Sequence, residues 1–500
     1  MAFEPIYEVA VLDGLQKLCS GQVVAEAKLV PPHGEEITKI LGVSAVADVT
    51  TTEVFTGEAR IKGKVDFRVL YSGAGGERSL DYRAEFTDKI TDDAIMGGHP
   101  CVIAKVLDTD IVSATDSEIK LAAVVETELF GQVSKRIKYL VNGGDSIYSH
   151  ESKINYTKVL CEVSGRTDVT AEASVNASKI ECVESRVCIG KTIASSNMVV
   201  IEGDVVSDVV YSNDSGMGHV LLTTPLSFEV EADGCVSGAT VCATAHLEGV
   251  KATIVEGEEN TILVNYDICA NGFVMEERSL QSVLDVFSVR NELNKTTEKI
   301  DFAVNKCCVY FEDEADGNVT LEAGLPIVDN IITPLGSSVI LSNVYATDGK
   351  VIIEGLVRTN VIYFSGESNS CNSVSVELPF STSKPLDVKE GDIVFASGEV
   401  LGITTKIRRG NEIDVRANLR FCANVSEKTE LCVITELSEG AEIVAPKGAI
   451  SMHIASKKET LWDVSKVLCA TPETVMEQNP ELSFPLSGGE RIVCFRKINR

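Results

Sequence analysis

The sequence predicts a mostly-β protein with three tandem antiparallel domains of β-sandwich or barrel-like type, followed by a small βααβ domain. One supporting observation is the strict alternation of apolar and polar residues over long runs, which is typical of strands with one buried face. A second is a signature strand that occurs three times at domain-sized intervals. A third is that strong helix signals gather in the last fifty residues.

The signature strand carries a Gly eight residues before a Tyr, and its clearest copy is Lys350–Phe364. A turn and a second alternating run that ends in Phe follow each copy, which predicts a β-hairpin. Because the Gly has the parity of the buried side chains, we expect a bulge or a close backbone approach there. The nine signature residues, expected to be structural, are Gly63, Tyr71, Phe86, Gly203, Tyr211, Phe228, Gly355, Tyr363 and Phe380.

Domain boundaries follow from the spacing of the copies. The signature glycines lie 140 and 152 residues apart, which is the size of a whole domain and too long for a solenoid repeat. The sequence therefore predicts β domains at 1–145, 150–290 and 295–440 and a terminal domain at 447–500. Each β domain is expected to hold seven or eight strands joined as hairpins.

Two segments lack the strict alternation of the strands, one between the second and third domains and one inside the third domain. The spacing of apolar residues in Ser279–Asn291 favours a short linker helix, with a strand that crosses between domains as the alternative. The acidic run Glu312–Gly317 separates two apolar runs and is interpreted as a solvated hairpin turn. A calcium loop is disfavoured because the run lacks the spacing and terminal Glu of an EF-hand.

Composition restricts the partners and the compartment. The 500 residues carry a formal net charge of −29, which disfavours nucleic acid as a partner because phosphates would be repelled. No run approaches the roughly 20 apolar residues of a membrane span. The N-terminal residues lack the basic and apolar regions of a secretory signal, so we expect a cytoplasmic protein.

Fifteen cysteines are scattered through the chain without a Cys-x-x-Cys motif. We interpret them first as buried reduced thiols that pack as small hydrophobic groups. Oxidative cross-linking in an assembled shell and metal binding are the alternatives.

The motifs of common catalytic sites are missing from the sequence. The six histidines lie in different segments without triad or metal spacing, and neither a P-loop nor a Gly-x-Ser-x-Gly elbow occurs. We therefore expect a protein without enzyme activity, cofactor or metal.

The last fifty residues predict the order strand, helix, helix, strand. Apolar residues in Leu461–Leu468 share one helical face, Thr471-Pro472 begins a second helix and Asn479-Pro480 ends it. Because so small a unit has little core, the single tryptophan, Trp462, is expected to anchor that core.

This tail resembles a LysM module, and the resemblance rests on Thr460-Leu461-Trp462, on Asn479-Pro480 and on the Gly489–Ile492 motif. The sequence departs from the family at Lys458, which stands where the family's opening motif has its first Gly. The resemblance implies that loops near Lys457–Thr460 and Asn479–Ser483 bind a partner protein or N-acetylglucosamine chains. The implied binding residues are Lys457, Lys458, Glu459, Thr460, Leu461, Asn479, Pro480, Glu481 and Leu482.

The three β domains resemble SPOCS domains, the β-rich modules of clostridial spore coat proteins. The Gly…Val-x-Tyr strand and the Phe after it carry this resemblance. The combination of three such domains with a terminal LysM module is similar to clostridial coat morphogenetic proteins that bind the basal-layer ATPase of the coat. In that family the LysM module binds protein.

The resemblance implies a non-enzymatic scaffold of spore coat assembly that docks to a coat protein through its LysM module. Its expected place is the mother-cell cytoplasm, at the forespore surface and in the spore coat. One alternative is an envelope protein that binds peptidoglycan. Another is a self-associating subunit of a shell or filament.

Overall fold

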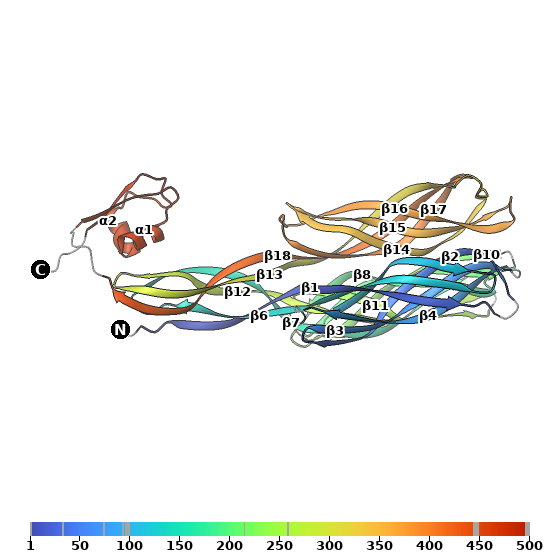
Figure 1. Cartoon of the computed structure of the whole chain (residues 1–500), viewed down its shortest axis with the longest axis horizontal. Helices are drawn as coiled ribbons and strands as arrows, with labels where there is room; N and C mark the ends of the chain where they lie inside the picture. Colours follow the sequence, from blue (N-terminus) through green and yellow to red (C-terminus); the bar gives the residue numbers. More distant parts are fainter. Residues whose placement is uncertain are drawn as a thin grey trace.

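The computed structural model describes residues 3–32, 35–73, 76–92, 95, 101–214, 216–257, 260–443 and 450–495. Within these residues the chain consists mainly of antiparallel strands, with two short helices near its C-terminus, so the mostly-β prediction is confirmed. Neither of these helices is long and apolar enough to cross a membrane. Figure 1 shows an elongated molecule with the N-terminus and the two helices at the same end.

The described residues begin with three units of six strands, and each unit packs its strands as a sandwich of two three-stranded layers. Within these residues the layers do not close into a barrel. The first unit contains β1 (Ile6–Leu29), β2 (Ile37–Phe55), β3 (Glu58–Gly73), β4 (Gly76–Thr91), β5 (Cys101–Ala114) and β6 (Ile119–Asn142). Its sheet orders are β2-β3-β4 and β1-β6-β5.

The second and third units repeat this topology strand for strand. The second contains β7 (Ile147–Ser174), β8 (Lys179–Ser195), β9 (Met198–Asn213), β10 (Gly216–Glu231), β11 (Thr240–Val255) and β12 (Thr261–Ser288). The third contains β13 (Asn291–Thr320), β14 (Asn330–Thr347), β15 (Lys350–Ser365), β16 (Ser370–Pro385), β17 (Ile393–Arg409) and β18 (Glu412–Glu442). In each unit the middle strand of one sheet is the signature strand: β3, β9 or β15.

The close backbone approach expected at the signature Gly is confirmed. In all three copies a Cβ atom at this Gly would lie 2.3–2.5 Å from a carbonyl oxygen of the neighbouring strand, which itself bulges next to the Gly. No side chain fits at such a distance, so Gly is required there. The pairs are Gly63 with Asp48, Gly203 with Cys188, and Gly355 with Ile340.

The expected count of seven or eight strands per unit was wrong, because long single strands replace expected hairpins. In the third unit the acidic run Glu312–Gly317 is not a turn but part of β13. Its alternate acidic side chains face basic ones on β18: Glu312 Oε1 lies 2.6 Å from Arg420 Nη2, and Glu314 Oε2 lies 3.4 Å from Arg416 Nη1. Cross-strand charge pairs of this kind favour a continuous strand over a turn.

The linker helix favoured for Ser279–Asn291 was also wrong, and the alternative of a strand was right. Residues up to Ser288 continue β12, and β13 begins at Asn291. A bulge at Leu284 shifts the alternation of side chains by one residue. That shift produces apolar spacings of three and four residues, which imitate a helix.

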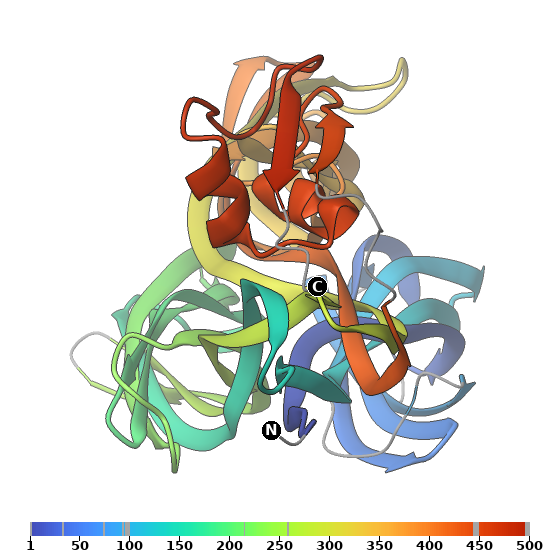
Figure 2. The same ribbon diagram turned by 90° about the vertical axis from the view of Figure 1, so that its left-hand side faces the viewer.

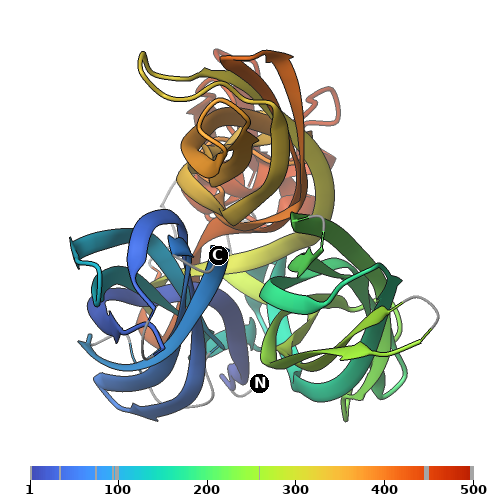
Figure 3. The same cartoon turned by 90° about the vertical axis from the view of Figure 1, so that its right-hand side faces the viewer.

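The first and last strands of each unit are the longest, at 24–31 residues, and they extend beyond the sandwich as a two-stranded ribbon. An isolated two-stranded ribbon is only marginally stable in water. The three ribbons instead surround a common axis and form what we call the stem (Figures 2 and 3). Its core combines residues of all three units: Leu12, Ile137, Tyr139, Leu280, Ile300, Leu431 and Val433.

A second apolar cluster joins the three units at the end away from the stem, and we call it the distal cluster. Its members include Leu70, Val210 and Ile362, which precede the signature Tyr in the three copies and are fully buried. These side chains point away from their own sandwich and toward the other units. The three sandwiches are therefore fixed to one another at both ends.

Buried polar groups also link the units where the stem meets the sandwiches. The Asp13 carboxylate of the first unit accepts the Val159 N–H at 3.0 Å and lies 2.8 Å from Lys158 Nζ, both in the second unit. Thr157 Oγ1 of the second unit accepts the Asn305 N–H of the third at 2.7 Å. The pairing of Asp13 with Thr157 also joins β1 to β7, so that one sheet runs through two units.

Candidate functional site

The C-terminal module is the part of the chain on which the implied binding residues lie. It consists of β19 (Ile450–Ile454), α1 (Leu461–Leu468), α2 (Pro472–Gln478) and β20 (Arg491–Phe495), with β19 antiparallel to β20. Both helices begin at a threonine N-cap, and at α1 the Thr460 and Asp463 side chains form a reciprocal capping box. The helices cover one face of the sheet, and Val464, Val475 and Ile492 are fully buried between them.

The first implied binding segment is partly exposed. Lys457, Lys458 and Thr460 are exposed, whereas Leu461 packs against the module core. The Glu459 carboxylate is used internally, because it accepts the Ser456 N–H at 2.7 Å and lies 2.8 Å from His453 Nε2. Only the exposed members of this segment are accessible to a partner.

In the second implied binding segment, Asn479 is buried and has a structural role within the module. Asn479 is 3 % exposed, and its side-chain amide donates to the Val475 carbonyl and exchanges hydrogen bonds with both backbone groups of Val493. This residue therefore ties the end of α2 to β20. Its neighbours differ, since Pro480 and Glu481 are exposed and Leu482 packs partly against the core.

The structure connects the first segment to the chain that follows the second. The Lys458 N–H donates to the Leu486 carbonyl at 2.8 Å, and the Leu486 N–H donates to the Glu459 carbonyl at 2.9 Å. Leu486 is itself buried in the module core. The first loop therefore lies beside the chain that follows the second loop.

The outer face of the two-stranded sheet carries large exposed apolar side chains. The register pairs Ile450 with Phe495 and Met452 with Val493, which places these residues on the same face of the sheet. Ile450, Met452 and Ile454 are 60–61 % exposed and Phe495 is 55 % exposed. We call this the sheet face of the module. The sequence does not reveal this face, because a five-residue strand shows too little alternation to assign its two faces.

Trp462 does not anchor the module core, and that expectation was wrong. Its ring packs instead against the stem, edge-on to Phe287 at 4.8 Å and 5.4 Å from the ring of His150. Phe287 in turn stacks on Tyr148 at 5.1 Å. The Trp462 indole N–H donates to Asp285 Oδ2 at 2.9 Å. The tryptophan therefore holds the module against the ribbon of the second unit.

Asp285 is the electrostatic centre of this contact, which we call the module dock. Its carboxylate lies 2.6 Å from Lys466 Nζ of the module and 2.6 Å from Lys295 Nζ of β13. Burial alone would raise the pKa of Asp285, but the hydrogen bonds from Lys295, Lys466 and Trp462 outweigh it and hold the pKa well below its usual range. Asp285 is therefore ionised at neutral pH.

A cleft of about 2280 Å³ lies between the three units, lined by residues of each. Three thiols lie near it at the boundary of the second and third units. Cys308 Sγ is 3.7 Å from Cys422 Sγ and also hydrogen-bonds with Cys242. These hydrogen bonds, together with burial, raise the pKa of the Cys308 thiol well above its ordinary value. The fourteen cysteines whose side chains the structure describes are all free thiols.

Comparison with known proteins bears on the third unit. A family model described as the SPOCS domain of SipL matches residues 328–408. This range spans β14 to β17 and contains the signature residues Gly355, Tyr363 and Phe380. No curated protein matches the chain. No solved structure matches it either. The SPOCS resemblance is confirmed for the third unit, which contains a SPOCS domain at residues 328–408, and it remains a resemblance for the first two units.

Proposed function

We propose that this protein is a non-enzymatic scaffold of spore coat assembly, which docks to a coat morphogenetic protein through its C-terminal module. The match of residues 328–408 to the SPOCS domain of SipL supports a role in sporulation. The proposed place of action is the mother-cell side of the forespore surface. The proposed partner is an ATPase of the coat basal layer.

The observation that carries the proposal is the sheet face of the module. Four large apolar side chains, each at least 55 % exposed, lie together on a domain of about fifty residues. Exposed apolar patches of this kind mark protein-binding surfaces, because burial against a partner removes them from water. The exposed loop residues Lys457, Lys458 and Glu481 supply charged groups elsewhere on the module.

The rigid body of three units suits a scaffold. Its units are joined by the stem core, the distal cluster and the polar contacts around Asp13, so they keep a fixed geometry. The dock then holds the module at the tip of the stem through Trp462 and Asp285. A partner bound to the module would be held at a defined position relative to the three sandwiches.

The module's polar groups favour a protein partner over a glycan. Sugar chains are recognised through hydrogen bonds from side chains such as Asn and Glu. In this module the Asn479 amide and the Glu459 carboxylate already make hydrogen bonds within the module. The sheet face offers apolar area instead, which suits a protein surface.

A pull-down with the full-length protein tests the proposal, with the basal-layer ATPase of the coat as bait. Met452→Asp places a charge at the centre of the sheet face and is expected to lower recovery of the protein by at least about tenfold, which is about 1.4 kcal/mol. Val467→Asp is the matched control, because Val467 is 59 % exposed on α1 and lies outside the sheet face. The control is expected to bind as the parent does.

A second variant, Lys457→Glu, separates the sheet face from the loops. If Lys457→Glu abolishes binding while Met452→Asp does not, docking occurs through the loops and the sheet face is not the contact. Sedimentation with purified peptidoglycan provides the opposing test. Co-sedimentation that depends on the module, without binding to the ATPase, would overturn the scaffold proposal in favour of an envelope protein.

A further inference from the structure

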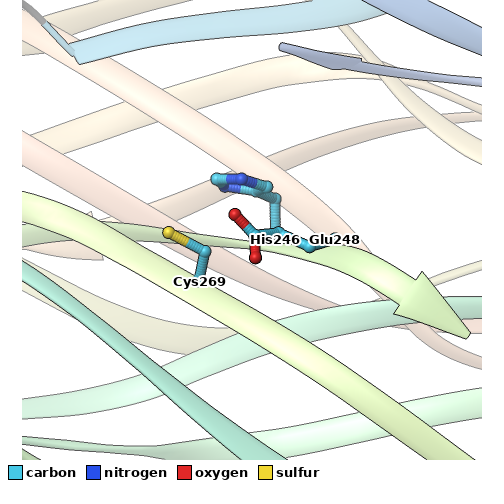
Figure 4. A group of neighbouring side chains, drawn as sticks. All are labelled: His246, Glu248 and Cys269. Carbon is cyan, nitrogen blue, oxygen red and sulfur yellow. The ribbon is translucent and has the colours of Figure 1, made fainter. Parts of the chain in front are cut away.

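Three side chains able to bind a metal lie together in the second unit. His246 and Glu248 belong to β11 and Cys269 to β12 (Figure 4). One nitrogen, one carboxylate oxygen and the sulfur lie within 4.8 Å of one another. This cluster is separate from the C-terminal module and from the module dock.

The sheet register creates this cluster. His246 lies directly opposite Cys269 in the β11–β12 pairing, so their side chains emerge on the same face. Glu248 is the extra residue of a bulge between Leu247 and Gly249. A bulge re-aims side chains, and here the Glu248 carboxylate comes into reach of the other two groups.

The cluster lies at the edge of the central cleft, in a partly protected setting. Cys269 is 7 % exposed, His246 is half-buried and Glu248 is exposed on the cleft side. All three residues line the cleft of about 2280 Å³ between the units. A bound ion would therefore be held by the sheet on one side and face solvent in the cleft on the other.

Hydrogen-bond donors surround the two groups that would carry negative charge. Asn271 Nδ2 lies 3.6 Å from Cys269 Sγ, and Arg166 Nη2 lies 2.7 Å from Glu248 Oε1. Arg166 is directly opposite Cys269 on β7, and its side chain is 75 % exposed. Lys64 of the first unit reaches the Glu248 carbonyl at 3.2 Å. The Arg166 side chain also hydrogen-bonds with Cys269, so without a metal it pairs with Glu248 and contacts the thiol as well.

We propose that His246, Glu248 and Cys269 form a zinc site with three protein ligands and a fourth position open to the central cleft. Imidazole nitrogen, thiolate sulfur and carboxylate oxygen are the donors that Zn²⁺ prefers. Calcium and magnesium require oxygen ligands and do not suit a site with a thiol and an imidazole. Binding releases the thiol proton, and the single charges of thiolate and carboxylate balance the ion.

Arg166 and a bound metal ion would compete for the Glu248 carboxylate. Arg166 must leave Glu248 when the carboxylate binds the ion, and its exposed side chain reaches water easily. An exposed ion pair is weak, so its loss only modestly opposes metal binding. This competition gives the site a specific signature, because removal of Arg166 tightens metal binding while removal of an ordinary surface arginine does not.

The test adds Co²⁺, a spectroscopic substitute for Zn²⁺, to the reduced, metal-free full-length protein. The expected result is a thiolate-to-cobalt charge-transfer band that saturates at one equivalent and disappears when Zn²⁺ is added. Cys269→Ser removes the band, and His246→Gln weakens binding by at least about 100-fold. Cys432→Ser, which removes an exposed thiol on β18, leaves the band intact. A missing band, or one that survives Cys269→Ser, overturns the proposal.

Arg166→Gln provides a measurement that does not risk the fold, because the side chain is exposed. We expect Co²⁺ binding about two- to fivefold tighter, which corresponds to the loss of an exposed ion pair. The matched control is Arg278→Gln, because Arg278 makes a comparable exposed ion pair with Glu276 at 2.8 Å. Equal affinities of the Arg166→Gln variant and the parent would show that the metal does not displace Arg166 from its partners, and would overturn the three-ligand site.

Discussion

The protein contains two kinds of internal interface that differ in chemistry. The three β units meet through buried apolar side chains, in the stem core and the distal cluster, and through buried polar contacts around Asp13. The C-terminal module meets the stem through one tryptophan and one aspartate with two half-exposed lysines. The first kind resembles a domain core and the second a small, partly polar contact between domains.

The difference indicates which part of the molecule can move. Separating the units would expose side chains that are at most 7 % accessible, at a large cost in free energy. Separating the module would expose mainly one aromatic cluster and would return three charged groups to water. We therefore expect the three units to unfold together and the module to detach on its own.

The largest effect is expected in the stem core. Leu12→Ala leaves a cavity beside Ile137, Ile300 and Val433, and should lower the free energy of unfolding by about 2–5 kcal/mol. Leu221→Ala, at a leucine 40 % exposed, should change it by less than about 0.5 kcal/mol. Denaturant unfolding followed by circular dichroism measures both. Equal midpoints for the two variants would contradict a shared stem core.

A smaller effect is expected at Asp13. Removal of its carboxylate in Asp13→Ala leaves the Val159 N–H and Lys158 without their partner and should cost about 1–3 kcal/mol. Asp110→Ala, at an exposed aspartate of β5, is the control.

The Asp13 contact should also give a defined pH dependence. Burial opposes ionisation, but hydrogen bonds from Lys158, Ser134 and Val159 lower the pKa of Asp13 below the ordinary 3.8. Because the folded-state pKa is depressed, this stabilisation is present above pH 3.8 and is lost as the pH falls through the lower folded value. The difference in stability between the parent and Asp13→Ala should therefore shrink in acid. A difference that grew in acid would contradict the assignment.

The smallest effect is expected at the module dock. Asp285→Ala removes the acceptor of Trp462, Lys295 and Lys466, and should weaken docking by about 0.5–1.5 kcal/mol. Since Trp462 is the only tryptophan, its fluorescence reports docking directly and should shift to the red. The melting temperature of the β units should stay unchanged. Glu277→Ala, at an exposed glutamate of β12, should leave the emission as in the parent.

Local structure could be predicted from the sequence, whereas the contacts between units could not. Alternation identified the signature hairpins, and the parity of Gly63 and its equivalents indicated the close backbone approach. The long strands of the stem were predicted as several shorter elements, because a bulge such as that at Leu284 disrupts the alternation of apolar and polar residues. The stem core was missed because its residues lie hundreds of positions apart.

One signal of the contacts between units was nevertheless present. Leu70, Val210 and Ile362 occupy the parity expected to face water, yet all three are apolar. An apolar residue at a position expected to face solvent, repeated in every copy, indicates that its side chain is buried against another domain. Here that domain is one of the other two units.

The candidate site residues were predictable only in part. The loops of the module followed from its resemblance to LysM, but the internal roles of Asn479 and Glu459 required coordinates. The contact between Trp462 and Phe287 joins residues of different domains and leaves no local pattern. His246 and Cys269 are neighbours only through strand register, so motif spacing could not reveal them.

Because the three β units belong to one polypeptide, residues around the axis are free to differ from copy to copy. The second unit alone provides Phe287 and Asp285 as the seat for the single module. A symmetric trimer of separate chains would carry three such seats and three modules. Within these 500 residues one module instead accompanies three β units, so the two ends of the three-lobed body differ and only one of them carries the docked module.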